Sequence, residues 1–209
     1  MSFSCTKCTR LSLFLSDIKK QNPDYFCQPV PPFGDQNAQL LIVGLAPGMH
    51  GANKTGRPFT GDYAGLLLYQ TLFDFKYSNR PQSLGVNDSL ELYNARITNA
   101  VKCLPPQNKP LPEEIKQCNQ YLKDEIDALP SLQVILALGK IAHDAVLAAF
   151  NVKKSLYPFK HGSVYSLNHR YTLISSYHCS RYNTQTNRLT ADMFKAIFTQ
   201  IQSITTPSL

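Results

Sequence analysis

Residues 40–65 read LLIVGLAPGMHGANKTGRPFTGDYAG and combine a strand, a loop and the start of a helix. Residues 40–43 are apolar and branched, which is typical of a strand buried on both faces. The stretch holds six of the chain's ten glycines, and this crowding indicates sharp turns or a backbone that closely approaches a ligand. After Asp62 the pattern becomes helical, with an apolar stripe of Leu66, Leu67, Tyr69, Gln70 and Phe73. In open α/β sheets such a loop binds ligands outside the carboxyl end of its strand.

The polar residues of this loop suit a flat ring better than a phosphate. The loop lacks both the Lys-Ser/Thr ending of a P-loop and the spacing of a dinucleotide fingerprint. It carries instead an amide at Asn53, an aromatic ring at Phe59 and a carboxylate at Asp62. A nucleobase is the flat polar ring that we expect there.

Three further apolar segments predict strands at 95–100, 133–138 and 171–175, with helical patterns between them. Strands that alternate with helices predict a parallel sheet covered on both faces, and 209 residues with 43% hydrophobic content fit one domain over 1–209. Right-handed crossovers bring the loops at the strand ends to one edge of the sheet. Those loops hold Asn53, Phe59, Asp62, Asn99, Asn108 and His178.

The chain carries 21 basic and 14 acidic residues, a net charge of +7. This excess favours a polyanionic partner such as nucleic acid, although solubility alone also explains it. No stretch approaches the roughly 20 apolar residues that span a bilayer, and the N-terminus has no apolar signal core. We therefore expect a soluble, intracellular (cytoplasmic) protein without a membrane partner. Disulfides are uncommon inside cells, so its six cysteines predict metal binding or chemistry.

Four of the cysteines form a candidate metal-binding set. Cys5 and Cys8 form a Cys-x-x-Cys pair, which alone is weak evidence. Cys103 follows the predicted strand 95–100, and Cys118 lies on the apolar face of the next predicted helix. Four thiolates suit either zinc or a [4Fe–4S] cluster, and the spacing does not choose between them.

Residues 44–62, GLAPGMHGANKTGRPFTGD, resemble the first signature of the uracil-DNA glycosylase superfamily, and within it the iron-sulphur family 5, also called type b. The resemblance continues in order through PVPPFGD (29–35), NARITNAVKCLPPQNKPLPEE (94–114) and SYHCSRYNTQTNRLT (176–190). It implies a three-layer α/β/α sandwich with a central four-stranded parallel sheet. It also implies a monomeric DNA glycosylase that flips uracil out of DNA and excises it hydrolytically in base excision repair, with a wider range of deaminated or damaged bases.

The resemblance also implies roles for individual residues. Asp62 and His178 are catalytic, with His178 donating a hydrogen bond to the leaving base. The substrate-binding residues are Ala46, Gly48, Asn53, Phe59, Asn99 and Asn108. The DNA-binding residues are Arg181, Asn183, Gln185 and Arg188, in a loop expected to act as a wedge and phosphate clamp. The ligands of a [4Fe–4S] cluster are Cys5, Cys8, Cys103 and Cys118.

Several alternatives stay open. Asp62 precedes a helix and is also a good N-cap. Asn108 reads the base edge by analogy with family 5, whereas Asn99 resembles the equivalent residue of a sister family. Ala46 stands where sister families place a polar or acidic residue that positions the water. A non-catalytic iron-sulphur or zinc nucleic-acid-binding module is the alternative function, and a redox carrier is a third.

Overall fold

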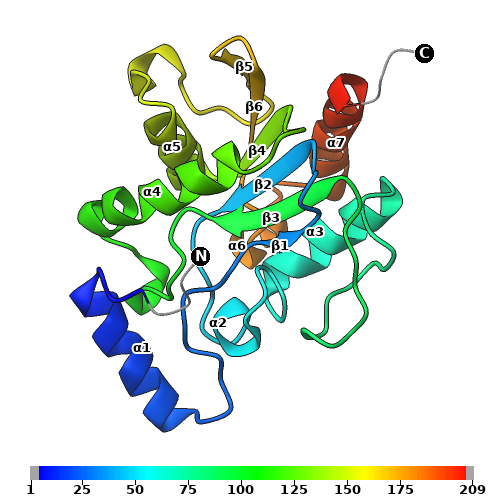
Figure 1. The fold of residues 1–209 in the computed structure, drawn as a ribbon. Helices are drawn as coiled ribbons and strands as arrows, with labels where there is room; N and C mark the ends of the chain where they lie inside the picture. Colours follow the sequence, from blue (N-terminus) through cyan, green and yellow to red (C-terminus); the bar gives the residue numbers. More distant parts are fainter. Residues whose placement is uncertain (1–4, 206–209) are drawn as a thin grey trace.

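The computed structural model describes residues 5–205 and contains a six-stranded sheet in the order β1-β3-β2-β4-β6-β5 (Figure 1). The four central strands run parallel to one another. They are β2 (Leu40–Gly44), β3 (Ala95–Asn99), β4 (Val134–Leu138) and β6 (Tyr171–Ser176). These are the four strands that the sequence predicts, and every residue of β2 and β4 is buried.

The sheet has two edge strands that the sequence did not predict. β1 (Phe33–Gly34) pairs antiparallel with β3, and β5 (Val164–Leu167) pairs antiparallel with β6. The expected four-stranded sheet is therefore the parallel centre of a six-stranded one. β1 has only two residues and β5 is largely exposed, so neither forms the apolar run that marks a buried strand.

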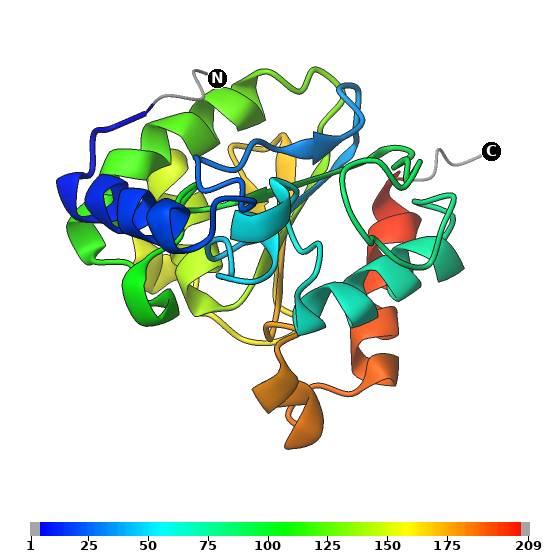
Figure 2. The same ribbon diagram turned by 90° about the horizontal axis from the view of Figure 1, so that it is seen from below.

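Helices cover both faces of the sheet and form a three-layer α/β/α sandwich (Figure 2). Leu40 and Ile42 of β2 face one layer, and Leu41 and Val43 face the other, because successive side chains alternate across a strand. The first layer consists of α3 (Tyr63–Asp74) and α7 (Ala191–Thr205), and the second of α4 (Pro112–Asp127) and α5 (Lys140–Ala149). The predicted fold class is confirmed.

The shorter elements are α2 (Ala52–Thr55), α6 (Arg181–Gln185) and the 3-10 helices η1 (Pro106–Asn108) and η2 (Lys154–Leu156). The N-terminal helix α1 (Thr9–Gln21) lies outside the sandwich, beside α4 and the loop before it (Figure 1). Arg10 joins α1 to α4 through two 2.8 Å hydrogen bonds to the buried carboxylate of Glu114. Within residues 5–205, no helix is both long and apolar enough to cross a membrane.

The topology places three loops at one edge of the sheet. From the central strand β2 the chain passes to β3 on one side, and from β3 it returns to β4 on the other side. This arrangement opens a crevice at the carboxyl ends of the strands, the usual ligand site of open α/β sheets. The loops after β2, β3 and β6 meet there.

Candidate active site

A cavity of about 360 Å³ opens at this edge. The loops after β2, β3 and β6 all contribute to its wall. Its lining consists of Leu45, Ala46, Gly48, Phe59, Asp62, Tyr63, Ala64, Asn99, Asn108, His178, Ser180 and Arg181. Eight of these twelve are residues that the sequence singled out, so one cavity unites most of the predicted site.

Two glycines give Phe59 and Asn99 their places in this cavity. A Cβ at Gly44 would lie 2.6 Å from Cζ of Phe59 and would overlap the side-chain oxygen of Asn99. A Cβ at Gly65 would overlap the carbonyl oxygen of Phe59. Phe59 itself is buried and has a φ of 58°, which L-residues seldom adopt. These glycines allow the backbone to approach the aromatic ring closely.

Two more glycines make room for the carboxylate of Asp62. A Cβ at Gly48 would lie 2.5 Å from Oδ1 of Asp62, and a Cβ at Gly51 would overlap the carboxylate itself. Asp62 occupies the N-cap position of α3, yet its Oδ2 accepts a hydrogen bond from the backbone N–H of Ala52 at 3.4 Å. Burial raises the pKa of Asp62, whereas the N–H of Ala52 and the nearby His50 oppose that rise.

His178 stacks against Phe59 with 6.0 Å between ring centroids and 25° between ring planes. Burial lowers the pKa of His178 to about 4, so its ring is neutral at neutral pH. A neutral imidazole still carries one N–H, which can donate to an oxygen in the cavity. Its backbone carbonyl accepts a 2.8 Å hydrogen bond from the amide of Asn183, which fixes the loop after β6.

Asn99 and Asn108 line the same cavity at different depths. Asn99 ends β3 and is buried, with 3% of its surface exposed. Asn108 ends η1 at the exposed rim and has a φ of 56°, a left-handed conformation that asparagine tolerates better than most residues. Both amides can therefore reach a base held in the cavity.

Asn53 is the predicted substrate-binding residue that the structure does not bring into the cavity lining. Its side chain is completely buried, and its amide nitrogen donates to Sγ of Cys27 at 3.4 Å. The short helix α2 directs Asn53 toward the N-terminal segment, and a reading of isolated polar residues cannot detect such a turn. In residues 5–205 the side-chain oxygen of Asn53 is one of two buried side-chain atoms without a hydrogen-bond partner.

The segment after His178 is partly helical, so the expected loop over 181–188 needs correction. Residues 181–185 form α6, and the side chain of Ser180 caps that helix by accepting from the N–H of Asn183. The guanidinium of Arg181 lies 5.0 Å from the ring centroid of Tyr63 at the cavity mouth. Arg188 lies over the ring of Tyr177, and it and Gln185 lie outside the cavity lining. Tyr63 and Ser180 were missed, although both neighbour predicted residues.

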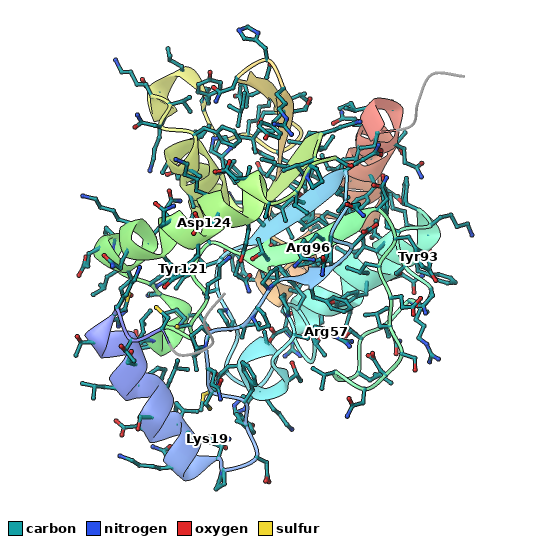
Figure 3. The ribbon with its side chains drawn as sticks, in the orientation of Figure 1. Lys19, Arg57, Tyr93, Arg96, Tyr121 and Asp124 are labelled. Atoms are coloured by element: carbon teal, nitrogen blue, oxygen red, sulfur yellow. The ribbon has the colours of Figure 1, made fainter. Side chains whose placement is uncertain are left out.

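The four predicted metal-ligating cysteines line a separate, small and largely apolar cavity at α1 and α4, the cysteine cavity. Figure 3 shows sulfur atoms grouped there beside Tyr121, whose hydroxyl donates to Sγ of Cys5 at 3.3 Å. Burial and the neighbouring cysteines raise the pKa of Cys103 to about 12. Within residues 5–205 none of the six cysteines forms a disulfide. No three His, Cys, Asp or Glu side chains among residues 5–205 are arranged for a single metal ion.

Lys102 connects the cysteine cavity to the larger one. Its backbone N–H donates to Sγ of Cys118 at 3.4 Å. Its buried ammonium donates 2.7 Å hydrogen bonds to the hydroxyl of Thr98, the backbone carbonyl of Asn99 and the carboxylate of Glu125. This residue therefore contacts both a candidate metal ligand and an asparagine of the base cavity.

Comparison with known proteins identifies the family. The model described as the uracil DNA glycosylase superfamily matches residues 31–202. A type-5 uracil-DNA glycosylase of Thermus thermophilus is 44% identical over 96% of this chain and 94% of its own length, and one of Pyrobaculum aerophilum is 39% identical over 90% and 84%. A type-4 uracil-DNA glycosylase of Archaeoglobus fulgidus is 33% identical over 78% and 69%. The chain belongs to the uracil-DNA glycosylase superfamily, and its type-5 relatives match it over nine-tenths or more of its length.

Proposed function

We propose that the chain is a monofunctional uracil-DNA glycosylase, which hydrolyses the N-glycosyl bond between uracil and deoxyribose in base excision repair. The observation that carries this proposal is the single cavity that unites Phe59, Asp62, Asn99, Asn108 and His178. The names of its type-5 relatives support the same activity. A substrate in genomic DNA also implies that the protein acts inside the cell.

The cavity walls suit a flipped uracil. An enzyme that acts on a base in duplex DNA must first extrude the nucleotide, at a cost of a few kcal/mol. The ring of Phe59 offers a stacking surface for the extruded base. The amides of Asn99 and Asn108 can donate to a carbonyl and accept from an N–H, as O4 and N3–H of uracil require. Cytosine presents the opposite pattern, so an amide held in this one orientation favours uracil.

His178 and Asp62 supply the chemistry. Breaking the glycosidic bond leaves cationic character on the sugar and negative charge on the departing base. The neutral ring of His178 donates its N–H to that anion, and a preorganised donor stabilises the charge as it develops. Asp62 orients the attacking water and faces the sugar cation, since the methyl side chain of Ala46 cannot do either.

The DNA strand follows the basic side of the cavity mouth. Arg181 lies at the mouth, and Arg188 lies further along the same segment. Guanidinium groups bind phosphate oxygens well, and the net charge of +7 favours DNA in general. Asn183 holds the backbone of His178, and Gln185 at the end of α6 adds a polar contact for the strand.

We propose further that Cys5, Cys8, Cys103 and Cys118 hold a [4Fe–4S] cluster. Their thiols line one cavity, and the backbone N–H of Lys102 and the hydroxyl of Tyr121 already donate to two of the sulfurs. Hydrogen bonds to sulfur and a largely apolar surrounding fit such a cluster. When bound, the cluster would link the N-terminal segment before α1 to the centre of the chain. Its role would be structural, and Asp62 and His178 would carry out the chemistry at the base.

Alanine at position 46, in place of an acidic side chain, leaves more room beside the base. We propose that the cavity therefore accepts other deaminated bases, including hypoxanthine. We also propose that the protein acts as a monomer. The test is single-turnover cleavage of oligonucleotides that each carry one uracil, hypoxanthine or cytosine. Uracil release with an intact strand until alkali treatment supports a monofunctional glycosylase. Tight binding without any release would favour a non-catalytic nucleic-acid-binding module, and strict confinement to uracil would contradict the wider range.

A further inference from the structure

A second cavity, of about 330 Å³, adjoins the base cavity. The two cavities share Phe59, Asp62, Tyr63 and Arg181 as walls. The other walls of the second cavity come from the glycine-rich loop, from α3 and from the segment that follows α3, namely Gly61, Gly65, Leu66, Gln82, Ser83 and Leu84. The two cavities are therefore immediate neighbours that meet at these four side chains.

The segment 83–88 on the far wall is held firmly. Arg57, labelled in Figure 3, extends its guanidinium from the glycine-rich loop to that segment. It donates to the carboxylate of Asp88 at 2.7 Å, to the hydroxyl of Ser83 at 3.0 Å and to the carbonyl of Val86 at 2.9 Å. Both members of this ion pair are largely buried. The carboxylate of Asp88 also accepts the backbone N–H of Leu84 at 2.7 Å.

The same segment exposes an apolar side chain beside the cavity. Leu84 is 79% exposed, and Leu66 on the neighbouring turn of α3 is 56% exposed. Neither leucine contributes much to the core, whereas the buried ion pair of Arg57 and Asp88 fixes the backbone that carries Leu84. A rigid support under an exposed apolar side chain reduces the entropy that a ligand contact would cost. Leu84 is therefore positioned to contact a ligand in this cavity.

We propose that this second cavity is a subsite for the nucleotide adjacent to the excised one in the same strand. The inference rests on the proposed function, because it requires a nucleic acid strand that continues beyond the base held in the base cavity. Arg181 stands on the shared wall, where the phosphate between the two nucleotides must pass. Leu66 and Leu84 offer an apolar surface to the neighbouring base, and the amide of Gln82 can bond to its edge.

The test removes the neighbouring base and the leucine separately. Single-stranded oligonucleotides carry uracil with both neighbours intact, with an abasic 5′ neighbour, or with an abasic 3′ neighbour. Binding is measured by fluorescence anisotropy with Asp62→Asn protein, so that the substrate is not consumed. Removal of one of the two neighbours should weaken binding about tenfold, the effect of losing the apolar contact between one base and the two leucines. Leu84→Ser should weaken binding of the intact strand similarly and should abolish the sensitivity to that abasic site.

Leu156→Ser is the matched control, because Leu156 is 68% exposed and lies outside both cavities. It should keep the affinity and the sensitivity of the unmodified protein. Leu66→Ser provides a second probe of the same surface and should act as Leu84→Ser does. Equal binding of all three oligonucleotides, or an unchanged sensitivity in Leu84→Ser, would overturn the subsite. Failure of the wild-type protein to release uracil would instead overturn the proposed function, which the binding measurement does not use.

Discussion

The carboxylate of Asp62 accepts the backbone N–H of Ala52 across the glycine-rich loop, although Asp62 stands at the N-cap of α3. Within the described residues it makes no capping hydrogen bond to that helix. Its side chain lies over Gly48 and Gly51, where only a hydrogen atom fits. The loop therefore holds this carboxylate in the cavity rather than at the helix end, which favours the catalytic interpretation of Asp62 over the capping one.

Asp62→Asn separates those two interpretations. Asparagine is nearly as good an N-cap as aspartate, so we expect unchanged folding and DNA binding. Loss of a group that positions water should slow the chemistry by about 10² or more. Single-turnover release of uracil measures the rate, and thermal unfolding provides the control. A rate near that of the wild type would leave Asp62 without a catalytic role.

Gly51→Ala should disable the same carboxylate from the opposite side. The backbone of Gly51, with a φ of −102° and a ψ of −110°, lies outside the regions that L-residues prefer, so the substitution adds backbone strain as well as a methyl group that overlaps Asp62. We expect the carboxylate to move and the single-turnover rate to fall by about 10². In an Asp62→Ala background the methyl group has room, so the second substitution should cost much less rate than it does alone, and what remains reports the backbone strain at Gly51. Additive losses in the double variant would show that Gly51 acts elsewhere.

Much of the fold follows from the sequence because four strands are buried on both faces. Their apolar runs are visible in any reading of the chain, whereas β1 and β5 lie at the edges and show no such run. The stripe expected on α3 was wrong in phase, because Leu66 is 56% exposed and Leu68 and Leu72 are buried. That error arose because the helix is apolar on nearly every side, so periodicity alone does not identify its inner face.

The site residues that could be predicted are those that lie at strand ends or in recognisable motifs. Phe59, Asp62 and His178 do meet in one cavity. The sequence could not show that α2 turns Asn53 into the N-terminal packing, since this depends on a contact with distant Cys27. Lys102 was missed for a related reason: it lies inside the motif at 94–114 but has no role assigned there, and its partner Glu125 is 23 residues away, outside any motif.

The rate of uracil release should fall in acid, and His178 should cause no change in rate between pH 6 and 8. Burial raises the pKa of Asp62, so this carboxylate takes up a proton at a higher pH than an exposed aspartate does. His178 stays neutral down to about pH 4, so it does not titrate in the neutral range. A single-turnover pH profile measures this. A loss of rate as the pH rises from 6 to 8 would indicate a protonated His178 and contradict its role as a neutral donor.

Stability should fall over an overlapping acid range. An unfolded His178 takes up a proton near pH 6.5, whereas the folded ring resists protonation until about pH 4. The unfolded state therefore binds more protons between these values, and acid favours it. His178→Asn should reduce the acid-induced drop in Tm between pH 6.5 and 4. An equal drop in both proteins would mean that other buried groups, such as His143, dominate the acid response.

The purified protein should be brown and contain about four iron atoms per chain, as a [4Fe–4S] cluster requires. Cys118→Ser should lose the iron and reduce soluble yield, since the thiolate ligands connect α1 to the centre of the chain. Cys27→Ser is the matched control, because Cys27 is buried but outside the cysteine cavity, and it should keep its iron. Stoichiometric zinc, or full stability of Cys118→Ser, would contradict the cluster.

Lys102→Met tests the connection between the cysteine cavity and the base cavity. The substitution leaves the carboxylate of Glu125 buried without its partner, and we expect the free energy of unfolding to fall by about 3–5 kcal/mol. The double variant Lys102→Met/Glu125→Leu removes both charges and should recover most of that loss, because a buried pair is often replaceable by apolar side chains. Its uracil-release rate should nevertheless stay about tenfold or more below that of the wild type, because the backbone of Asn99 has lost the ammonium that positions it. Denaturant unfolding and single-turnover cleavage separate the two effects. A double variant with restored stability and a full rate would show that Lys102 contributes to folding alone.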